Sequence, residues 1–206
     1  MSHRRGSLAR AARHRRTMLS HKRGRILLVA VLSLACAILR AQDAWDTADR
    51  QARRLSPSMF RRLPLPVRAD LERRRCTIPQ VWSDTVAANV ISGHFRTPAE
   101  TDWAVLCSVN GVSTILVYVK GRVDSVAKLG PAPDKHYLQG VGAGRIGYSR
   151  AIAAVDSTVI RRDYQWYGGT EPPPLDHQGI DDAFVGKASE VWYWYQGQWL
   201  RLTGAD

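Results

Sequence analysis

The chain closes with the stretch GIDDAFVGKASEVWYWYQGQWLRL at residues 179–202, whose composition predicts two strands joined by a short turn. The same pattern of serines, apolar positions and a turn glycine occurs earlier in the chain, so that Gly121 aligns with Gly197. Similarity at a fixed spacing is the mark of a repeated structural unit. The sequence therefore predicts a duplicated strand–turn–strand unit, with copies over about 89–126 and 176–202.

Strand-like segments dominate the chain beyond its N-terminal arm. Residues 89–95 and 113–119 read as strands, residues 102–108 are apolar enough for a strand buried on both faces, and the Asn-Gly pair at 110–111 is a hairpin signal. Two or three copies are too few to close a propeller, which needs about four blades or more. The predicted fold class is mainly β, as a small sandwich or open propeller-blade-like repeats, with an N-terminal helical arm.

The middle of the chain has a less regular pattern. Residues 137–169, with strands predicted at 150–155 and 158–167, are interpreted as a degenerate middle copy of the unit. Residues 131–134 are predicted to be a loop. The glycines at 140–147 include a G-x-G-x-x-G match, but the residues after them read as a strand rather than a helix, which favours a turn over a nucleotide-binding loop.

Residues 1–41 are organised like a secretory leader. A basic segment without acids precedes an apolar run at 26–39, which is shorter than the about 20 residues that a membrane span needs and typical of a signal peptide. Small residues up to Ala41 offer cleavage sites. The alternative is an uncleaved N-terminal anchor, and translation is predicted to start at Met18 rather than Met1.

Two further export signals are partial matches. The Arg15-Arg16 pair resembles a twin-arginine signal but lies far from the apolar run, and a lipoprotein cleavage site at Cys36 would have Ser33 in place of the usual leucine. All these alternatives predict an exported protein that is periplasmic, secreted or held at the outer envelope, with membrane contact only through residues 26–39 if they are retained.

The net charge of +12 is carried largely by the leader. Residues 1–40 hold ten Lys or Arg and no acid, whereas eleven basic residues face thirteen acids from Cys76 onward. The later part of the chain therefore lacks the basic excess of a nucleic-acid-binding face, and no nucleic-acid partner is predicted. Residues 42–75 are predicted to be a helical or partly disordered linker, and residues 76–206 the β domain.

Beyond the leader the chain contains two cysteines, Cys76 and Cys107. In an oxidising compartment two cysteines most simply form one disulfide. Closing that loop would add about 3–4 kcal/mol to the free energy of unfolding on the chain-entropy model. A catalytic cysteine would need a partnered histidine, and neither cysteine has one near it in the sequence.

Two segments carry a family resemblance. Gly93-His-Phe95 followed by Asp102-Trp-Ala-Val, and the run from Asp176 to Gly186, resemble the FG-GAP (integrin-type) repeat family. The resemblance implies that each segment is a propeller blade with a calcium-binding loop ahead of an apolar strand. The chain as a whole also resembles exported bacterial proteins, a likeness that implies no particular activity.

The calcium-binding loop is incomplete in both copies. Calcium takes six to eight oxygen ligands, and the first copy has a histidine, an arginine and a proline at ligand positions, which excludes calcium there. In the second copy Asp176 and Asp182 lie at ligand positions and Asp181 is adjacent, but Pro174 and Gln178 replace two acids. No cofactor is predicted, and calcium at these three aspartates is the alternative to a turn at the start of a strand.

His177 lies beside the same three aspartates, Asp176, Asp181 and Asp182. This cluster allows a hydrolase in which the histidine acts as base and an aspartate orients it. No serine or cysteine stands in a nucleophile-elbow context to accompany it. The enzyme assignment is therefore left open, with a non-enzymatic protein favoured.

The last strands carry a concentration of aromatic residues, Trp192, Trp194 and Trp199 among them. Alternation along a strand places neighbouring aromatics on opposite faces, so one face is core and the other is either covered or free to bind a glycan or a partner protein. The predicted function is an exported, non-enzymatic interaction or structural module of the cell envelope or the secreted fraction.

Overall fold

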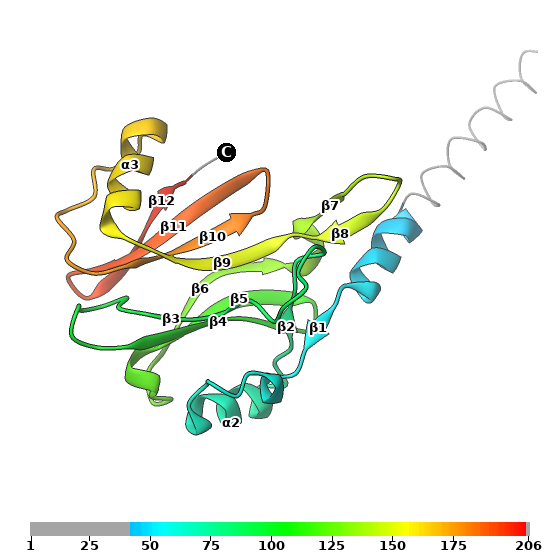
Figure 1. The fold of residues 1–206 in the computed structure, drawn as a ribbon, viewed down its shortest axis with the longest axis horizontal. Coiled ribbons are helices and arrows are strands. Elements are labelled where there is room, and N and C mark those ends of the chain that lie inside the picture. The colour runs from blue at the N-terminus through cyan, green and yellow to red at the C-terminus, as the bar shows by residue number, and fades with distance from the viewer. Residues whose placement is uncertain (1–41, 205–206) are drawn as a thin grey trace, which may run out of the picture. The chain divides into compact units, whose positions relative to one another are not determined.

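Two four-stranded antiparallel sheets form the centre of the fold in the computed structural model, which describes residues 42–204 (Figure 1). The strand order is β3-β4-β5-β6 in the first sheet and β12-β11-β10-β9 in the second. The strands of the first sheet are β3 Val90–Gly93, β4 Asp102–Val109, β5 Val112–Tyr118 and β6 Val126–Pro133, and those of the second are β9 Arg150–Val155, β10 Gly179–Phe184, β11 Ala188–Tyr195 and β12 Gln198–Thr203.

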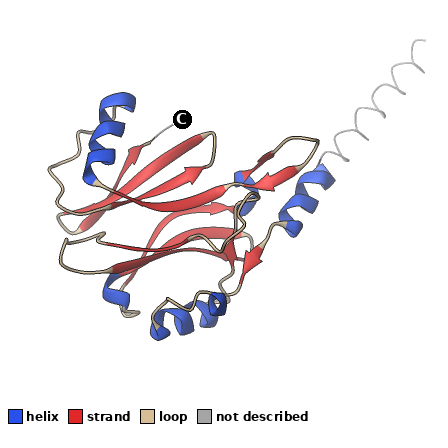
Figure 2. Ribbon diagram, in the orientation of Figure 1, coloured by secondary structure: helices blue, strands red, loops and turns tan. Residues whose placement is uncertain are grey.

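Smaller elements surround the two sheets (Figure 2). Strand β1 pairs with β2, and β7 pairs with β8. Strands predominate over helices, and no sheet of the described residues is closed. These elements are β1 Arg54–Leu55, β2 Ile78–Pro79, β7 Leu138–Gly140, β8 Ile146–Tyr148, the helices α2 Leu65–Arg73 and α3 Ser157–Tyr167, and the 3₁₀ turns η1 Pro57–Met59, η2 Val119–Gly121 and η3 Asp134–Tyr137.

The chain divides into two compact units, Met1–Ala44 and Trp45–Asp206, and the described strands all belong to the second. Residues 42–51 are helical. The leader and its apolar run at 26–39 lie outside the described residues. Within residues 42–204, no helix is both long enough and apolar enough to cross a membrane.

The inner faces of the two sheets share one apolar core. Leu106 and Ile115 of the first sheet lie in the same buried cluster as Ile152 and Ile180 of the second. Strand alternation produces this arrangement, because every second residue of each strand points at the opposing sheet. The buried members of the cluster are Phe95, Ala104, Leu106, Ile115, Val117, Leu129, Ile152 and Ile180.

Strand β4 is buried on both faces, which confirms the prediction for residues 102–108. Its outward-facing Val105 and Cys107 lie in a second cluster with Val67 and Leu71 of α2. Helix α2 therefore belongs to the same packed unit as the sheet, and it covers part of the face opposite to the inter-sheet core.

The two halves of the predicted repeat have the same strand order but different turns. Asn110 and Gly111 have positive φ angles of 52° and 76°, the backbone of a tight hairpin turn, so the hairpin prediction is confirmed. Gly121 lies in η2, within a long connection between β5 and β6. Gly197 instead lies in the two-residue turn between β11 and β12, so the aligned glycines occupy different kinds of turn.

The strand prediction for residues 158–167 is wrong, because these residues form most of α3. Their β-branched and aromatic side chains favour strands, but Ile160 and Tyr164 are one helical turn apart and both pack against the third apolar cluster. Burial of that face against β11 and β12 outweighs the local strand preference. The predicted middle copy thus contains a helix that connects β9 to β10.

Two stretches predicted as irregular have opposite outcomes. The loop prediction for residues 131–134 is wrong for 131–133, because β6 continues to Pro133. Proline lacks a backbone N–H, and β6 tolerates it as an edge strand with one free side. The stretch 140–147 does contain the predicted turn, since Gly142 and Gly144 with positive φ connect β7 to β8.

Candidate functional site

The predicted disulfide between Cys76 and Cys107 is present, with the two Cα atoms 5.4 Å apart. It joins the segment that follows α2 to the outer face of β4. The bond thereby fixes the C-terminal end of α2 over the first sheet, two residues from Arg74.

Asp182, a predicted ligand or catalytic residue, is committed to a buried ion pair. Its carboxylate accepts hydrogen bonds from Arg150 Nε at 2.8 Å and Arg150 Nη2 at 2.7 Å. The remaining Arg150 donors reach Ser113 through its carbonyl and hydroxyl oxygens, both at 2.9 Å, and the Gly130 carbonyl at 2.6 Å. The arginine side chain is fully buried, and it links the second sheet to β5 and β6 of the first.

Asp181 points to the opposite face of β10 from Asp182, as neighbours on a strand do. Burial raises the pKa of the Asp181 carboxyl, a hydrogen bond from Ser189 opposes this, and the nearby Asp163 and Asp182 carboxylates raise it further. Asp163 of α3 is itself buried and pairs with Arg162 at 2.9 Å. The carboxylates of Asp181 and Asp182, which are adjacent in the sequence, therefore lie in two separate environments.

His177 and Asp176 are brought together at the surface. Asp176 Oδ1 lies 2.9 Å from His177 Nδ1, and the Trp194 carbonyl oxygen lies 2.9 Å from Nε2. The His177 side chain is 7% exposed, whereas that of Asp176 is 78% exposed. The hydrogen bond from His177 lowers the pKa of Asp176. Both ring nitrogens of His177 are thus engaged, one with the Asp176 carboxylate and the other with the Trp194 carbonyl oxygen.

The three aspartates thus do not converge on one point with His177. Among residues 42–204, no group of three or more His, Cys, Asp or Glu side chains is placed to hold a metal ion. Asp182 faces the inter-sheet core, Asp181 the side of α3, and Asp176 the solvent.

The three tryptophans proposed for binding are all partly buried. Trp192 and Trp199 pack against the inter-sheet core, and Trp194 contacts Trp199 edge to face, with ring centroids 5.7 Å apart. The Arg96 guanidinium lies 4.4 Å above the Trp194 ring. Tyr193, which stands between Trp192 and Trp194 on β11, points to the opposite face and is buried in the cluster that includes Ile160 of α3. These aromatics therefore contribute first to packing.

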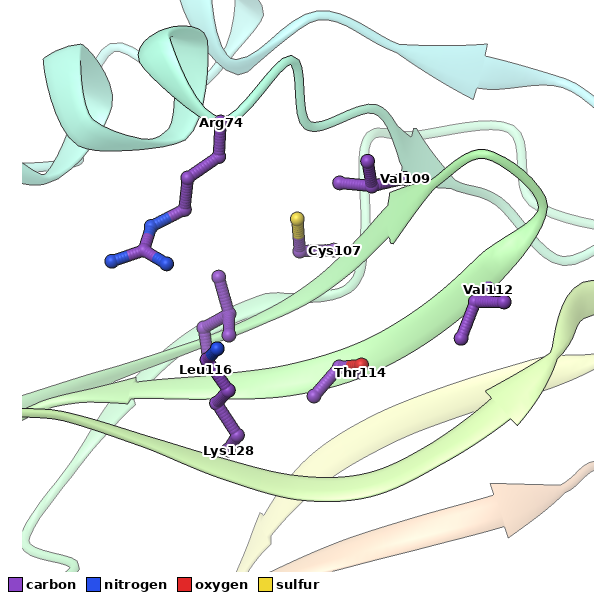
Figure 3. A pocket seen from close by; sticks show the side chains of 7 residues that line it. All are labelled: Arg74, Cys107, Val109, Val112, Thr114, Leu116 and Lys128. Carbon is purple, nitrogen blue, oxygen red and sulfur yellow. The ribbon is translucent and has the colours of Figure 1, made fainter.

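A groove on the outer face of the first sheet offers a different candidate site (Figure 3). Its volume is about 330 Å³, within the range of about 300–1,000 Å³ that is typical of ligand pockets. Its floor consists of outward-facing side chains of β4 and β5, beside the part of the sheet that α2 covers. The lining residues are Arg74, Cys107, Val109, Val112, Thr114, Leu116 and Lys128.

The strand register gives this groove two chemically different ends. Val109 pairs with Val112 next to the hairpin turn, and Val112 is 42% exposed. Farther along β5, Leu116 pairs with Lys128 of the neighbouring strand β6. Arg74 reaches down from the end of α2 toward the end with Leu116 (Figure 3). One end is therefore apolar and the other cationic.

Arg74 is held in place by a buried carboxylate. Its Nε donates to Asp70 Oδ2 at 2.6 Å, and Tyr118 Oη donates to the same oxygen at 2.9 Å. Burial by itself would raise the pKa of Asp70, but hydrogen bonds from Arg74, Arg73 and Tyr118 outweigh it and lower the pKa. The Asp70 side chain is only 1% exposed, so it binds Arg74 without presenting a carboxylate to the groove. Lys128 is exposed and makes no ion pair with any described residue.

Comparison of the chain with protein-family models, with curated proteins and with solved structures finds no match. No sequence motif marks the groove, so its residues are not among those predicted from the sequence. The signal available was the period-two pattern Val112, Thr114, Leu116, together with the predicted disulfide that brings Arg74 to β4.

Proposed function

We propose that the protein is an exported, non-enzymatic binding module, and that its groove takes a small anion with an apolar body. The observation that carries the proposal is the polarity of the groove, with Arg74 and Lys128 at one end and Val109 and Val112 at the other. A carboxylate or phosphate head would lie at the cationic end, where no acidic side chain lines the groove.

The length of the groove limits the size of the ligand. From Val112 to Leu116 the strand advances about 13 Å at roughly 3.3 Å per residue. This distance suits a medium-length acyl chain or an aryl group joined to one charged head. An apolar body would gain about 25 cal/mol per Å² of surface removed from water, while the two cations would fix its direction.

The proposed compartment is outside the cytoplasm. The leader-like pattern of residues 1–41 supports export, and a disulfide that orders the groove suits an oxidising environment. For the architecture we propose a small sandwich of two related four-stranded meanders. The shared core between the sheets and their common strand order support it, and the likeness to FG-GAP repeats stays a prediction.

Isothermal titration of the full chain with octanoate tests the proposal. Octanoate should bind, and octylamine, which has the same apolar body with the opposite charge, should not. Lys128→Glu should weaken octanoate binding about twofold to fivefold, the scale of one exposed charge interaction. Lys135→Glu, an exposed lysine outside the groove, is the matched control and should leave binding unchanged.

The apolar end has its own variant. Val112→Asp places a carboxylate where the tail is expected, and it should reduce octanoate binding at least as much as Lys128→Glu does. Equal binding of octanoate and octylamine, or equal effects of Lys128→Glu and Lys135→Glu, would contradict the proposed ligand class.

A further inference from the structure

The segment from η1 to the first turn of α2 presents two different faces. Phe60 and Leu63 turn inward, with Leu63 only 3% exposed in the cluster that α2 forms with the first sheet. Met59 and Leu65 turn outward and are 63% and 69% exposed. Two large apolar side chains are thus held in water on a segment that already has inward-facing apolar anchors.

This segment is held in a fixed conformation by its backbone. Met59 N donates to the Ser56 carbonyl at 3.0 Å, Phe60 N to Pro57 at 3.1 Å, and Leu63 N to Phe60 at 3.1 Å. These consecutive turns and the buried Pro57 fix the direction in which the outward-facing side chains point. The two exposed apolar side chains are therefore presented by a rigid support, and no local collapse covers them.

Positive charge accompanies the exposed apolar pair. Arg61 and Arg62 are both exposed, and neither makes an ion pair or hydrogen bond with any residue of the described range. Residues 56–69 contain no Asp or Glu. By contrast, the exposed Trp166 of α3 has Arg162 over its ring at 5.2 Å, and that arginine pairs with Asp163.

We propose that Met59, Arg61, Arg62 and Leu65, here named the basic–apolar loop, dock on an anionic lipid surface. Apolar side chains enter the boundary between head groups and acyl chains, and flanking arginines attract anionic head groups. The basic–apolar loop therefore matches an anionic membrane both in its apolar side chains and in its positive charge. This contact is separate from the groove, and it is also separate from the apolar run at 26–39, so it acts whether or not the leader is retained.

Hydrogen exchange on the full chain tests the loop independently of the leader. Exchange of amides in residues 56–68 is measured by mass spectrometry with vesicles of phosphatidylglycerol and, separately, of phosphatidylcholine. The expected result is slower exchange of this segment with phosphatidylglycerol vesicles only, reversed by high salt. The leader holds ten Lys or Arg of its own and also favours phosphatidylglycerol. The readout is therefore the exchange of residues 56–68 themselves, compared between the wild type and loop variants that keep the same leader.

Variants assign the effect to residues. Arg61→Gln/Arg62→Gln should raise the lipid concentration for half-maximal protection about thirtyfold, at about 1 kcal/mol per arginine near an anionic surface. Met59→Ser/Leu65→Ser should also weaken protection at least tenfold, since the apolar contacts are lost. Arg161→Gln/Trp166→Ser, the same kinds of change at exposed positions of α3, is the matched control and should have no effect.

Three outcomes overturn the proposal. Equal protection by the two lipids excludes recognition of anionic head groups. Protection that survives both loop variants places the contact elsewhere. Loss with the arginine variant but none with Met59→Ser/Leu65→Ser shows a purely electrostatic contact and excludes the apolar insertion that the proposal requires. All substituted side chains are exposed, so exchange of β4 and β5 should stay unchanged and confirm folding.

Discussion

Arg150 and Asp182 form a bidentate ion pair in the interior, with nitrogen–oxygen distances of 2.8 Å and 2.7 Å and with both side chains at most 3% exposed. Every N–H of this guanidinium has an acceptor, and the acceptors come from both sheets. A buried charge is tolerated only with such complete pairing. The Arg150 side chain, held by Asp182 within the second sheet, therefore also joins that sheet to β5 and β6 of the first.

Breaking this ion pair should strongly destabilise the protein. Arg150→Met leaves the Asp182 carboxylate buried without a cation, and we expect a loss of about 3–5 kcal/mol in the free energy of unfolding. Replacing both residues, as Arg150→Met/Asp182→Leu, should recover most of that loss because no charge is left behind. Urea denaturation at neutral pH measures all three proteins.

An exposed ion pair of the same sheet provides the control. Arg201 and Glu190 pair at 2.9 Å with side chains 57% and 42% exposed. Arg201→Met should cost no more than about 1 kcal/mol. If Arg150→Met costs as little as Arg201→Met, the buried pair does not have the role assigned to it.

A glycine at position 130, next to this ion pair, should be required for full stability of the fold. Its φ is +51°, and a Cβ at this position would lie 2.9 Å from both Arg150 Nη2 and Asp182 Oδ2. We expect Gly130→Ala to lower the free energy of unfolding by about 1–3 kcal/mol, since backbone strain and a displaced ion pair combine. Gly142→Ala is matched to it, because Gly142 also has positive φ but no atom within 4 Å of the added Cβ. Chemical denaturation should show a clearly smaller effect there, and equal effects would assign the cost to the backbone alone.

Local patterns in the sequence predict much of this fold. The apolar run at residues 102–108, the Asn-Gly turn and the cysteine pair each predict what the structure contains. These are local signals, or in the case of the disulfide a matter of counting. Local signals do not predict helix α3, because Val159, Ile160 and Tyr164 intrinsically favour strands. Only tertiary packing selects the helix.

The candidate site is less predictable for a related reason. Asp176, Asp181 and Asp182 are close in sequence, but strand alternation directs two of them to opposite faces. The partner of Asp182 is Arg150 across the neighbouring strand, which no spacing motif marks. The groove similarly combines Arg74 of one helix end with residues of three strands.

The stability of the protein should respond to the ionisation of Asp102. Burial raises the pKa of this carboxyl, although hydrogen bonds from the Lys120, Arg96 and Phe95 backbone and the Arg96 charge oppose the rise. A folded pKa above the unfolded value of about 3.9 means that the contribution of Asp102 is complete below that value. It is lost as pH rises through the folded pKa.

Comparison with Asp102→Asn isolates this effect. The variant cannot ionise, so the free energy of unfolding of the wild type should decline relative to the variant as pH rises above about 4. The difference in slope is the readout, because the amide also changes the hydrogen bonds by a constant amount. Parallel stability curves from urea titrations between pH 3 and pH 7 would contradict a raised pKa.

The disulfide should control ligand binding as well as stability. Cys76→Ser/Cys107→Ser removes a constraint worth about 3–4 kcal/mol on the chain-entropy model. It also frees the segment after α2, on which Arg74 is carried to the cationic end of the groove. We expect the double variant to fold with a lower midpoint of urea denaturation and to bind octanoate several-fold more weakly.

Lys128 remains in place on β6, so a partial loss of affinity is expected, and Lys128→Glu in the same background should remove the rest. Octanoate titrations well below the denaturation midpoint separate the two effects, because the protein is folded throughout. Unchanged octanoate affinity in the double variant would show that Asp70 and Tyr118 alone position Arg74.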